Sequence, residues 1–463
     1  SDRLSMKTFL ATLGACWIIC SCIIPLHDVH AAPLPENTGA AETQQQEGEF
    51  SFDDIEQNTP GSEDSRTGFT LKGHFRNLFT WIKVNEYSES GEEKSLAANL
   101  SRIRFSPEFT YSDILLVHAD LDNETVFGSY LGSREFDGFW RDGYSNYNDM
   151  LHLSRDIHYD DDVLYRAKVH RAYMKLSVKS LTVTAGRQLV RFGSGRLWNP
   201  LDIMNPLSPL SLEGAEDQKG TDALRTEYFF NEYTVLSLVL SQNREYDRGE
   251  MSEWSSENTS AVGRFKTSIL PLETEIAVIG GRLIRKNLGG ADISTIIMGG
   301  TLRGSWIYLA PDDYRSYTQG SAGYEYNFRC GLYVLMEYFY NRNGINYNEE
   351  LRSAYMFSQA YGIDETTYYI LSNQFLTWNR HYGGLALGYD LHPLVRAELF
   401  TIWDVQGRGV FLNPSLKINP LQDVDIVLSV MQGHVFNGAR HASDFEYLRD
   451  YPLVYASLTW YFL

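Results

Sequence analysis

Residues 165–209 read YRAKVHRAYMKLSVKSLTVTAGRQLVRFGSGRLWNPLDIMNPLSP. Between positions 171 and 178, apolar side chains at even positions alternate with polar ones at odd positions, which is the pattern of a β-strand. Lys179-Ser180 predicts a tight turn, and a second β-rich run begins at Leu181. Two such strands fit a barrel in lipid, with apolar side chains toward hydrocarbon and polar ones toward a wet lumen. Residues 193–209 form a Gly-, Pro- and Asn-rich segment, and such a loop at a strand end can fold back over a pore.

The composition favours one large β-structure. The 463 residues include 14% aromatic residues and 37 glycines, and the formal net charge is −19. After residue 32, no apolar run approaches the ~20 residues that a helix needs to span a bilayer. Abundant Tyr and Phe together with polar loops are typical of a barrel with aromatic girdles. A soluble all-β protein is the alternative.

Strand-like runs follow one another from Thr67 to the C-terminus. We count eighteen, with sixteen as the alternative. Short turns, for example at Asn231-Glu232 and Asn419-Pro420, alternate with connections that are often long. Short periplasmic turns and long extracellular loops are the outer-membrane arrangement, and keeping it requires that the run 290–310 be two strands. The predicted fold is therefore an all-β transmembrane antiparallel β-barrel over residues 67–463, with a short helix near residues 349–359.

The first 66 residues are predicted to lie outside the barrel. Residues 1–31 resemble a signal peptide, with a basic start, an apolar run over 9–24 and small residues before position 31. Residues 32–66 contain nine acids and one base, a composition that predicts a disordered tail. A docking segment for a periplasmic partner is the functional alternative for this tail. Only Cys330 remains after signal cleavage, so no internal disulfide is expected, and no metal site or cofactor is predicted.

The C-terminal run also points to the outer membrane. Between residues 454 and 462, apolar side chains occupy the even positions and hydroxyl-bearing side chains occupy the odd positions. The run ends in Trp460, Tyr461 and Phe462 before Leu463. Such a strand resembles the segment that bacterial barrel-assembly machinery recognises. We therefore expect a bacterial outer-membrane protein whose partners are outer-membrane lipids and this machinery, and no nucleic acid.

Many charged side chains fall on the strand faces opposite the apolar ones. A charge on the lipid face costs roughly 2–4 kcal/mol at the bilayer midplane, so these residues are predicted to line the lumen. Bases come mostly from early strands and acids more from late strands, which predicts a basic wall facing an acidic wall. Pairing that only braces the wall is the alternative for each charge. The residues predicted to line or cap an anion-binding constriction are Arg102, Arg104, Arg171, Lys175, Arg187, Arg191, Arg196, Arg225 and Arg396, with the acids Glu227 and Glu398.

Arg187 and Arg191 break the alternation. Strict period two puts both on the lipid-facing side with Leu181 and Val183. Either a bulge at Gly186 reverses the register, or both arginines lie above the hydrocarbon. We favour the bulge.

These residues resemble a known family. Gly186-Arg187-Gln188, followed by Gly193, Arg196-Leu197 and Asp202, is similar to the motif of the alginate-export family of outer-membrane barrels, and the segment TDALR at 221–225 resembles the strand that follows it there. The resemblance covers about forty residues and implies an eighteen-stranded barrel that passes an anionic polysaccharide through an arginine-lined constriction. Asn205-Pro206 departs toward other barrel families and leaves the substrate open.

Three functional classes fit the sequence. The first is a porin-like channel, not an enzyme, for an anionic or sugar-like solute, including an exported polysaccharide. The second is a plugged structural or adhesin barrel. The third is an outer-membrane lipid hydrolase, which needs a Ser and a His on adjacent strands; His118 and His170 beside Ser177 are candidates by residue type only.

Overall fold

The computed structural model describes residues 67–84, 94–132, 149–212, 218–243, 246–247, 250–251, 258–361, 370–371, 374–439, 441–446, 448–449 and 451–462. The predicted signal peptide (1–31) and acidic tail (32–66) lie outside the described residues. Within the described ranges, no helix is both long and apolar enough to cross a membrane.

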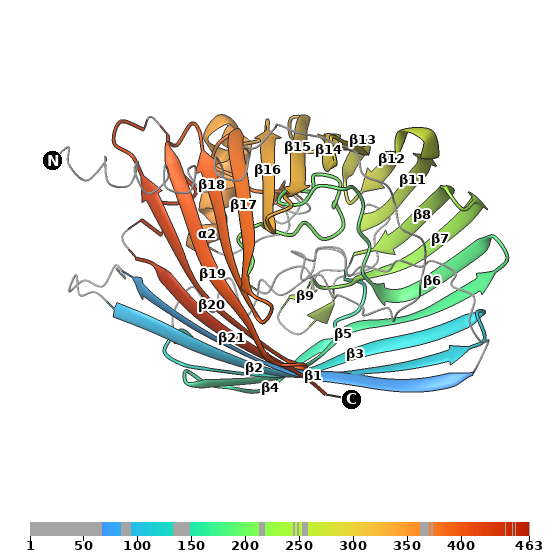
Figure 1. Cartoon of the computed structure of the whole chain (residues 1–463), viewed down its shortest axis with the longest axis horizontal. Coiled ribbons are helices and arrows are strands. Elements are labelled where there is room, and N and C mark those ends of the chain that lie inside the picture. The colour runs from blue at the N-terminus through green and yellow to red at the C-terminus, as the bar shows by residue number, and fades with distance from the viewer. Residues whose placement is uncertain are drawn as a thin grey trace, which may run out of the picture.

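Eighteen of the described strands close into one antiparallel barrel (Figure 1). Each pairs with the next barrel strand along the chain, and β21 returns to pair with β1, with Gly73 opposite Phe462. The prediction of eighteen strands is confirmed, and the alternative of sixteen is wrong. The barrel strands are β1 (Gly68–Val84), β2 (Lys94–Tyr111), β3 (Leu115–Phe127), β5 (Val163–Val178), β6 (Leu181–Gln188), β7 (Thr221–Asn231), β8 (Thr234–Gln242), β11 (Thr259–Ile269), β12 (Thr274–Leu283), β13 (Lys286–Ile297), β14 (Gly300–Pro311), β15 (Tyr317–Asn327), β16 (Leu332–Asn341), β17 (His381–His392), β18 (Val395–Asp404), β19 (Gly409–Leu421), β20 (Val424–Val435) and β21 (Leu453–Phe462).

The remaining elements are short. The strand β4 (Ser154–Tyr159) pairs with the first half of β5, and β9 (Tyr246–Asp247) pairs with β10 (Glu250–Met251). The 3-10 helices are η3 (Leu270–Leu272) and η4 (Ile345–Tyr347). The helix α2 (Glu349–Tyr361) confirms the helix predicted near residues 349–359.

The apolar strand faces point outward, as the alternation predicts. On β5, Met174, Leu176 and Val178 are 50%, 43% and 51% exposed, whereas the intervening Lys175 and Ser177 are less exposed. Similar exposed apolar side chains recur around the barrel, such as Leu238 and Trp306. A closed antiparallel barrel with an apolar exterior satisfies its backbone hydrogen bonds in hydrocarbon. The architecture therefore places the protein in the outer membrane.

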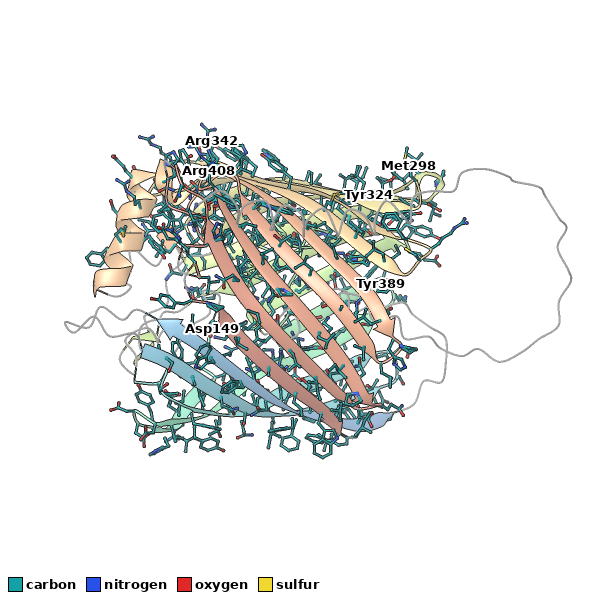
Figure 2. All side chains as sticks on the ribbon, turned by 60° about the vertical axis from the view of Figure 1, so that its left-hand side comes forward. Asp149, Met298, Tyr324, Arg342, Tyr389 and Arg408 are labelled. Carbon is teal, nitrogen blue, oxygen red and sulfur yellow. The ribbon has the colours of Figure 1, made fainter. Side chains whose placement is uncertain are left out.

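The two rims differ as predicted. At one rim short turns join the strands, and Figure 2 shows Met298, Tyr324 and Tyr389 at this end. The run 290–310 is indeed two strands, joined by Met298-Gly299. At the other rim lie the long connections after β3, β6, β8, β16 and β20. Three connections at the long-loop rim are also short, namely residues 284–285, 312–316 and 405–408.

The barrel interior contains two apolar clusters. One joins Leu197 and Trp198 to Phe339, Tyr382 and Phe411. The other joins residues such as Phe192 and Leu201 to side chains of β8, β11, β12 and β14. Both clusters include the segment after β6, so that segment packs inside the barrel.

Candidate functional site

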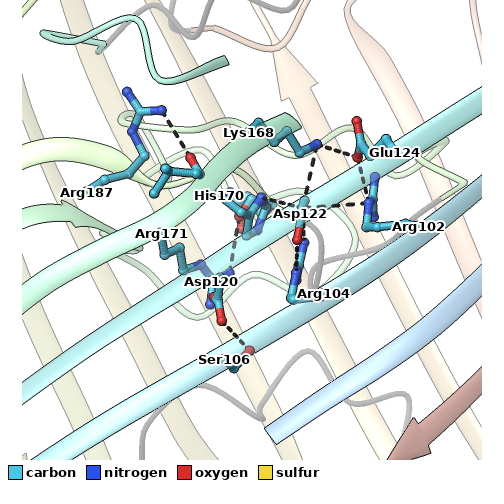
Figure 3. Close-up of polar contacts among 12 residues, drawn as sticks. Arg102, Arg104, Ser106, Asp120, Asp122, Glu124, Lys168, His170, Arg171 and Arg187 are labelled. Atoms are coloured by element: carbon cyan, nitrogen blue, oxygen red, sulfur yellow. Dashed lines mark hydrogen bonds and ion pairs between the residues drawn. The ribbon is translucent and has the colours of Figure 1, made fainter. Parts of the chain in front are cut away.

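The inward faces of β2, β3 and β5 carry a dense ion-pair network (Figure 3). Arg104 donates to both oxygens of Asp122, from Nε at 2.6 Å and from Nη2 at 2.8 Å. Arg102 donates to Glu124 at 2.6 Å, and the Lys168 ammonium lies 2.6 Å from the same Glu124 oxygen. The five side chains are largely buried. We call the network on β2, β3 and β5 the early wall.

A β-bulge completes the early wall. Asp120 lies opposite Arg171 and Leu121 lies opposite Val169, so His170 is an extra residue on β5. A bulge reverses the alternation on one side of the extra residue, which lets both His170 and Arg171 face the lumen (Figure 3). The Arg171 guanidinium donates to the carbonyl of Gln218 at 3.2 Å.

The expectation of a basic wall facing an acidic wall is wrong. The acids Asp120, Asp122 and Glu124 stand on β3, directly between the bases of β2 and those of β5. Charge is therefore interleaved within one wall and compensated locally. Local compensation weakens the transverse field that segregated walls would create.

Arg187 faces inward because of Gly186. The register of β6 with β5 and β7 is continuous, so the predicted bulge is absent. Instead Gly186 has φ 122°, where a Cβ would lie 2.3 Å from the carbonyl oxygen of Ala172. This backbone conformation is open to glycine, and Arg187 beyond it is 3% exposed.

Arg187 braces the wall. It donates to both oxygens of Asp222 at 2.8 Å and to the carbonyl of Leu151 at 2.7 Å. The second Asp222 oxygen also accepts from the backbone N–H groups of Met150 and Leu151. β6 ends at Gln188, directly after Arg187. The hydrogen bonds therefore connect β7 with the segment that precedes β4, at the end of β6. Arg187 is thus committed to a structural contact.

Residues 189–212, which we call the inward loop, cross the lumen from β6 toward β16 (Figure 1). Glu337 on β16 accepts three backbone N–H groups of this loop, from Arg196 at 3.1 Å, Leu197 at 3.3 Å and Trp198 at 2.7 Å. The guanidinium of Arg196 donates to Glu325 on β15 at 3.2 and 3.3 Å. The loop that the sequence predicts to fold over the pore is therefore anchored inside it.

Further contacts hold the inward loop along its length. Ser194 donates to Asp292 on β13 from its backbone N–H at 3.1 Å and from its hydroxyl at 3.0 Å. The Trp198 ring stacks on Phe339 with centroids 5.3 Å apart. Arg191 pairs with Asp202 at 3.3 Å within the loop. Burial raises the pKa of Asp202 to about 6, although Arg191 opposes the shift.

The remaining sequence-predicted residues lie on other strands. Arg225 donates to Glu227 at 2.6 Å on β7. Arg396 donates to Glu398 at 3.0 Å on β18 and to Asp390 at 3.0 Å. Lys175 faces the lumen on β5, and no ion pair joins it to a described carboxylate. The predicted arginines are distributed over the early wall, the β6–β7 seam, the inward loop, β7 and β18, and most of them are ion-paired.

Sequence reasoning missed Arg264 on β11. Its guanidinium carbon lies 5.7 Å from the ring centroid of Phe192 in the inward loop. No described carboxylate forms an ion pair with Arg264, and its buried Nε has no hydrogen-bond partner. Val262, Arg264 and Lys266 alternate with the exposed Phe265. This alternation could have placed Arg264 in the lumen, but the inward loop beside it is visible only in three dimensions.

The hydrolase candidates do not form a catalytic pair. The Ser177 hydroxyl lies 3.2 Å from the hydroxyl of Thr182. His118 contacts Glu108 and Asp120 at 3.2 and 3.1 Å, and His170 approaches Asp122 at 3.9 Å. None of these recorded contacts joins a histidine to the Ser177 hydroxyl, which a serine nucleophile requires.

Comparisons with known proteins support the fold. No protein-family model and no curated protein matches the chain. OccK9 (OpdG) of Pseudomonas aeruginosa aligns with TM-score 0.50 at 10% identity, over 85% of this chain and 98% of that one. OccD3 (OpdP) of the same organism gives 0.49 at 11% identity over 86% and 93%. A BenF-like porin from Pseudomonas fluorescens Pf-5 gives 0.48 at 10% identity over 85% and 98%. At 10% identity the likeness to OccK9 shows a porin-like barrel fold alone, and the resemblance to the alginate-export family stays a prediction.

Proposed function

We propose that the protein is a diffusion channel of the outer membrane for an anionic or sugar-like solute. The inward loop supports this proposal, because Glu337 and Glu325 hold it across the lumen, where it narrows the path. Porin-like selectivity arises from charges and width at such a narrowing. The channel performs no chemistry on the solute.

The anion contact is assigned to side chains near the inward loop that carry spare donors. Arg264 beside Phe192 has no carboxylate partner among the described residues. Arg225 stands two strands away and its Nε has no hydrogen-bond partner, although its Nη2 donates to Glu227. Ser237 lies between them, opposite Glu227 on β7 and Arg264 on β11. A guanidinium with free donors offers two parallel hydrogen bonds to a carboxylate.

A second candidate is a plugged scaffold. The apolar cluster that joins the inward loop to Phe339 and Tyr382 favours it, because this cluster fills part of the lumen. Single-channel recording in planar bilayers separates the two. The channel proposal expects discrete conductance steps and a reversal potential, in a KCl gradient, that shifts with the charge at position 264. A folded barrel without conductance would support the scaffold.

Two partner assignments extend the proposal. β21 closes the barrel against β1 and ends in Trp460, Tyr461 and Phe462, which suits a strand that the assembly machinery recognises. Residues 32–66 are proposed to dock a periplasmic partner. Deletion of 32–66 should then reduce transport in cells while single-channel conductance stays the same, and unchanged transport in cells would contradict the docking role.

A further inference from the structure

Exposed aromatic side chains form a band on the outside of β16–β18. Tyr338 and Trp403 are 46% and 39% exposed, and both lie opposite Gly383 in the sheet, so they are neighbours on the outer face of these strands. Aromatic side chains on a barrel exterior concentrate where hydrocarbon meets the polar headgroups. Arg342 continues the outward alternation of β16 beyond Tyr338, on the long-loop side of this band. It therefore reaches the headgroup level of the outer leaflet.

Two more arginines lie on neighbouring connections of the same rim, and one of them contacts Arg342. The Nε of Arg380 donates to the carbonyl of Arg342 at 3.2 Å, and the backbone N–H of Arg380 donates to the Gln406 side chain at 2.8 Å. Arg408 belongs to the same four-residue connection as Gln406. Figure 2 shows Arg342 and Arg408 at the long-loop end of the barrel, and both are exposed. We call Arg342, Arg380 and Arg408 the rim cluster.

The rim cluster carries three positive charges. In the described part of the chain, no carboxylate forms an ion pair with any of the three guanidinium groups. That of Arg380 instead lies over the Tyr347 ring at 4.1 Å. Two acids near the cluster, one at the end of β18 and one in the connection after β20, accept hydrogen bonds from other groups. Asp404 accepts from Asn379 at 2.7 Å and from the Gly407 N–H at 2.9 Å, and Asp444 accepts from the Tyr382 hydroxyl at 2.5 Å.

The same rim shows the opposite arrangement a few strands away. Arg282 pairs with Asp312 at 2.5 Å, and Arg285 pairs with Asp313 at 3.0 Å. These cations also lie at the long-loop end, but each has an exposed aspartate. Arg282 and Arg285 therefore differ from the rim cluster in having an ion-pair partner.

We propose that the rim cluster binds the phosphorylated headgroup of an outer-leaflet lipid. Planar guanidinium groups bind phosphate oxygens through paired, charge-assisted hydrogen bonds. Apolar surface for the rest of the lipid adjoins the cluster, since Val405 is 61% exposed and Phe436 is 50% exposed. The backbone N–H of Phe436 donates to the carbonyl of Arg408 at 2.9 Å, which keeps this apolar side chain next to the charge. Cations outside an aromatic band, with exposed apolar side chains beside them, match a ligand that is anionic at one end and apolar at the other.

The test is native mass spectrometry of the full barrel in detergent, with diphosphoryl lipid A as the probe. The variant is Arg342→Ala/Arg408→Ala, and the matched control is Arg282→Ala/Arg285→Ala at the compensated part of the rim. An arginine near an anionic lipid surface contributes about 1 kcal/mol, so losing two should weaken lipid binding roughly tenfold or more. The control should retain wild-type binding. Heat-modifiable migration on a gel verifies that each variant is a folded barrel.

Two further probes identify the source of the phosphate. Zwitterionic phosphatidylethanolamine should bind more weakly than lipid A and should not distinguish the two variants. Inorganic phosphate at millimolar concentration should not displace lipid A, because it lacks the apolar part. Displacement by inorganic phosphate would overturn the lipid assignment in favour of a soluble anion. Equal lipid A binding by wild type and the Arg342→Ala/Arg408→Ala variant would overturn the site itself.

Discussion

The early wall and the region around the inward loop use the same residue types in different ways. On the early wall, the recorded contacts join Arg102, Arg104 and Lys168 to Asp122 and Glu124. Around the inward loop, Glu337 and Asp292 instead accept from backbone N–H groups, and Arg264 forms no ion pair with a described carboxylate. The number of arginines therefore does not measure the capacity to bind an anion. The partners already present decide whether an arginine braces the wall or remains available to a solute.

The largest effect is expected from removing the shared acid of the early wall. In Asp122→Ala, Arg104 loses both oxygens that it contacts at 2.6 and 2.8 Å. Breaking a buried ion pair from one side costs roughly 3–5 kcal/mol. The midpoint of urea unfolding in lipid vesicles should fall markedly, while ion selectivity of the surviving channels changes little. The exposed pair provides the control, since Asp313→Ala should cost about 1 kcal/mol or less. Equal losses in the two variants would erase the distinction between buried bracing and surface pairing.

The next effect concerns the anchor of the inward loop. Glu337→Ala removes the acceptor of three loop N–H groups, and each hydrogen bond to a charged acceptor contributes about 1.5–3 kcal/mol. The loop should then leave its position, so single-channel conductance and current noise should rise, with Glu337→Gln intermediate. Glu398→Gln is the matched control, because Glu398 is also buried but pairs with Arg396 on the wall. Wild-type conductance in Glu337→Ala would mean that the loop does not set the width of the path.

A smaller effect, on ion selectivity, should distinguish Arg264 from the arginines that are already ion-paired. At a few ångströms, one charge contributes about 1 kcal/mol in water, so Arg264→Ala should lower the anion-to-cation permeability ratio by roughly fivefold at most. Arg396→Ala is the comparison, because Glu398 and Asp390 already compensate Arg396. Reversal potentials in a KCl gradient measure both variants. A larger shift in Arg396→Ala than in Arg264→Ala would contradict the argument from pairing.

The smallest effect is a pH dependence of the protein's stability, which arises from a buried acid at the long-loop rim. Burial raises the pKa of Asp444 to about 7. The folded protein therefore holds this proton more tightly than the unfolded chain does. Protonation of Asp444 stabilises the fold fully below the ordinary carboxyl pKa, and this stabilisation is lost as the pH rises through about 7. The melting temperature in detergent should fall between about pH 4 and pH 7 and level off above pH 7. Asp444→Asn keeps an acceptor for the Tyr382 hydroxyl and should flatten this dependence; an unchanged slope would assign it to other groups.

The sequence determined the barrel because the alternation of apolar and polar residues within each strand identifies its lipid-facing and lumen-facing sides. Period-two alternation, the alternation of short and long connections and the aromatic end at Phe462 are local signals, and they predicted eighteen strands and the split of 290–310 correctly. They also predicted that the segment after β6 can fold inward, and that charges such as Arg102 and Arg225 face the lumen.

Only the tertiary structure decided which charges meet. Asp122 and Arg104 are partners because β2 and β3 pair in one register, and Glu337 reaches the inward loop across a gap of 139 residues in sequence. Gly186 turns Arg187 inward through one positive φ angle, which no alternation rule contains. Strand periodicity fixes the face on which a side chain lies, whereas its partner depends on register, closure and loop path. Register, closure and loop path depend on the whole barrel. They decide which arginines are ion-paired in the wall and which one is available to a solute.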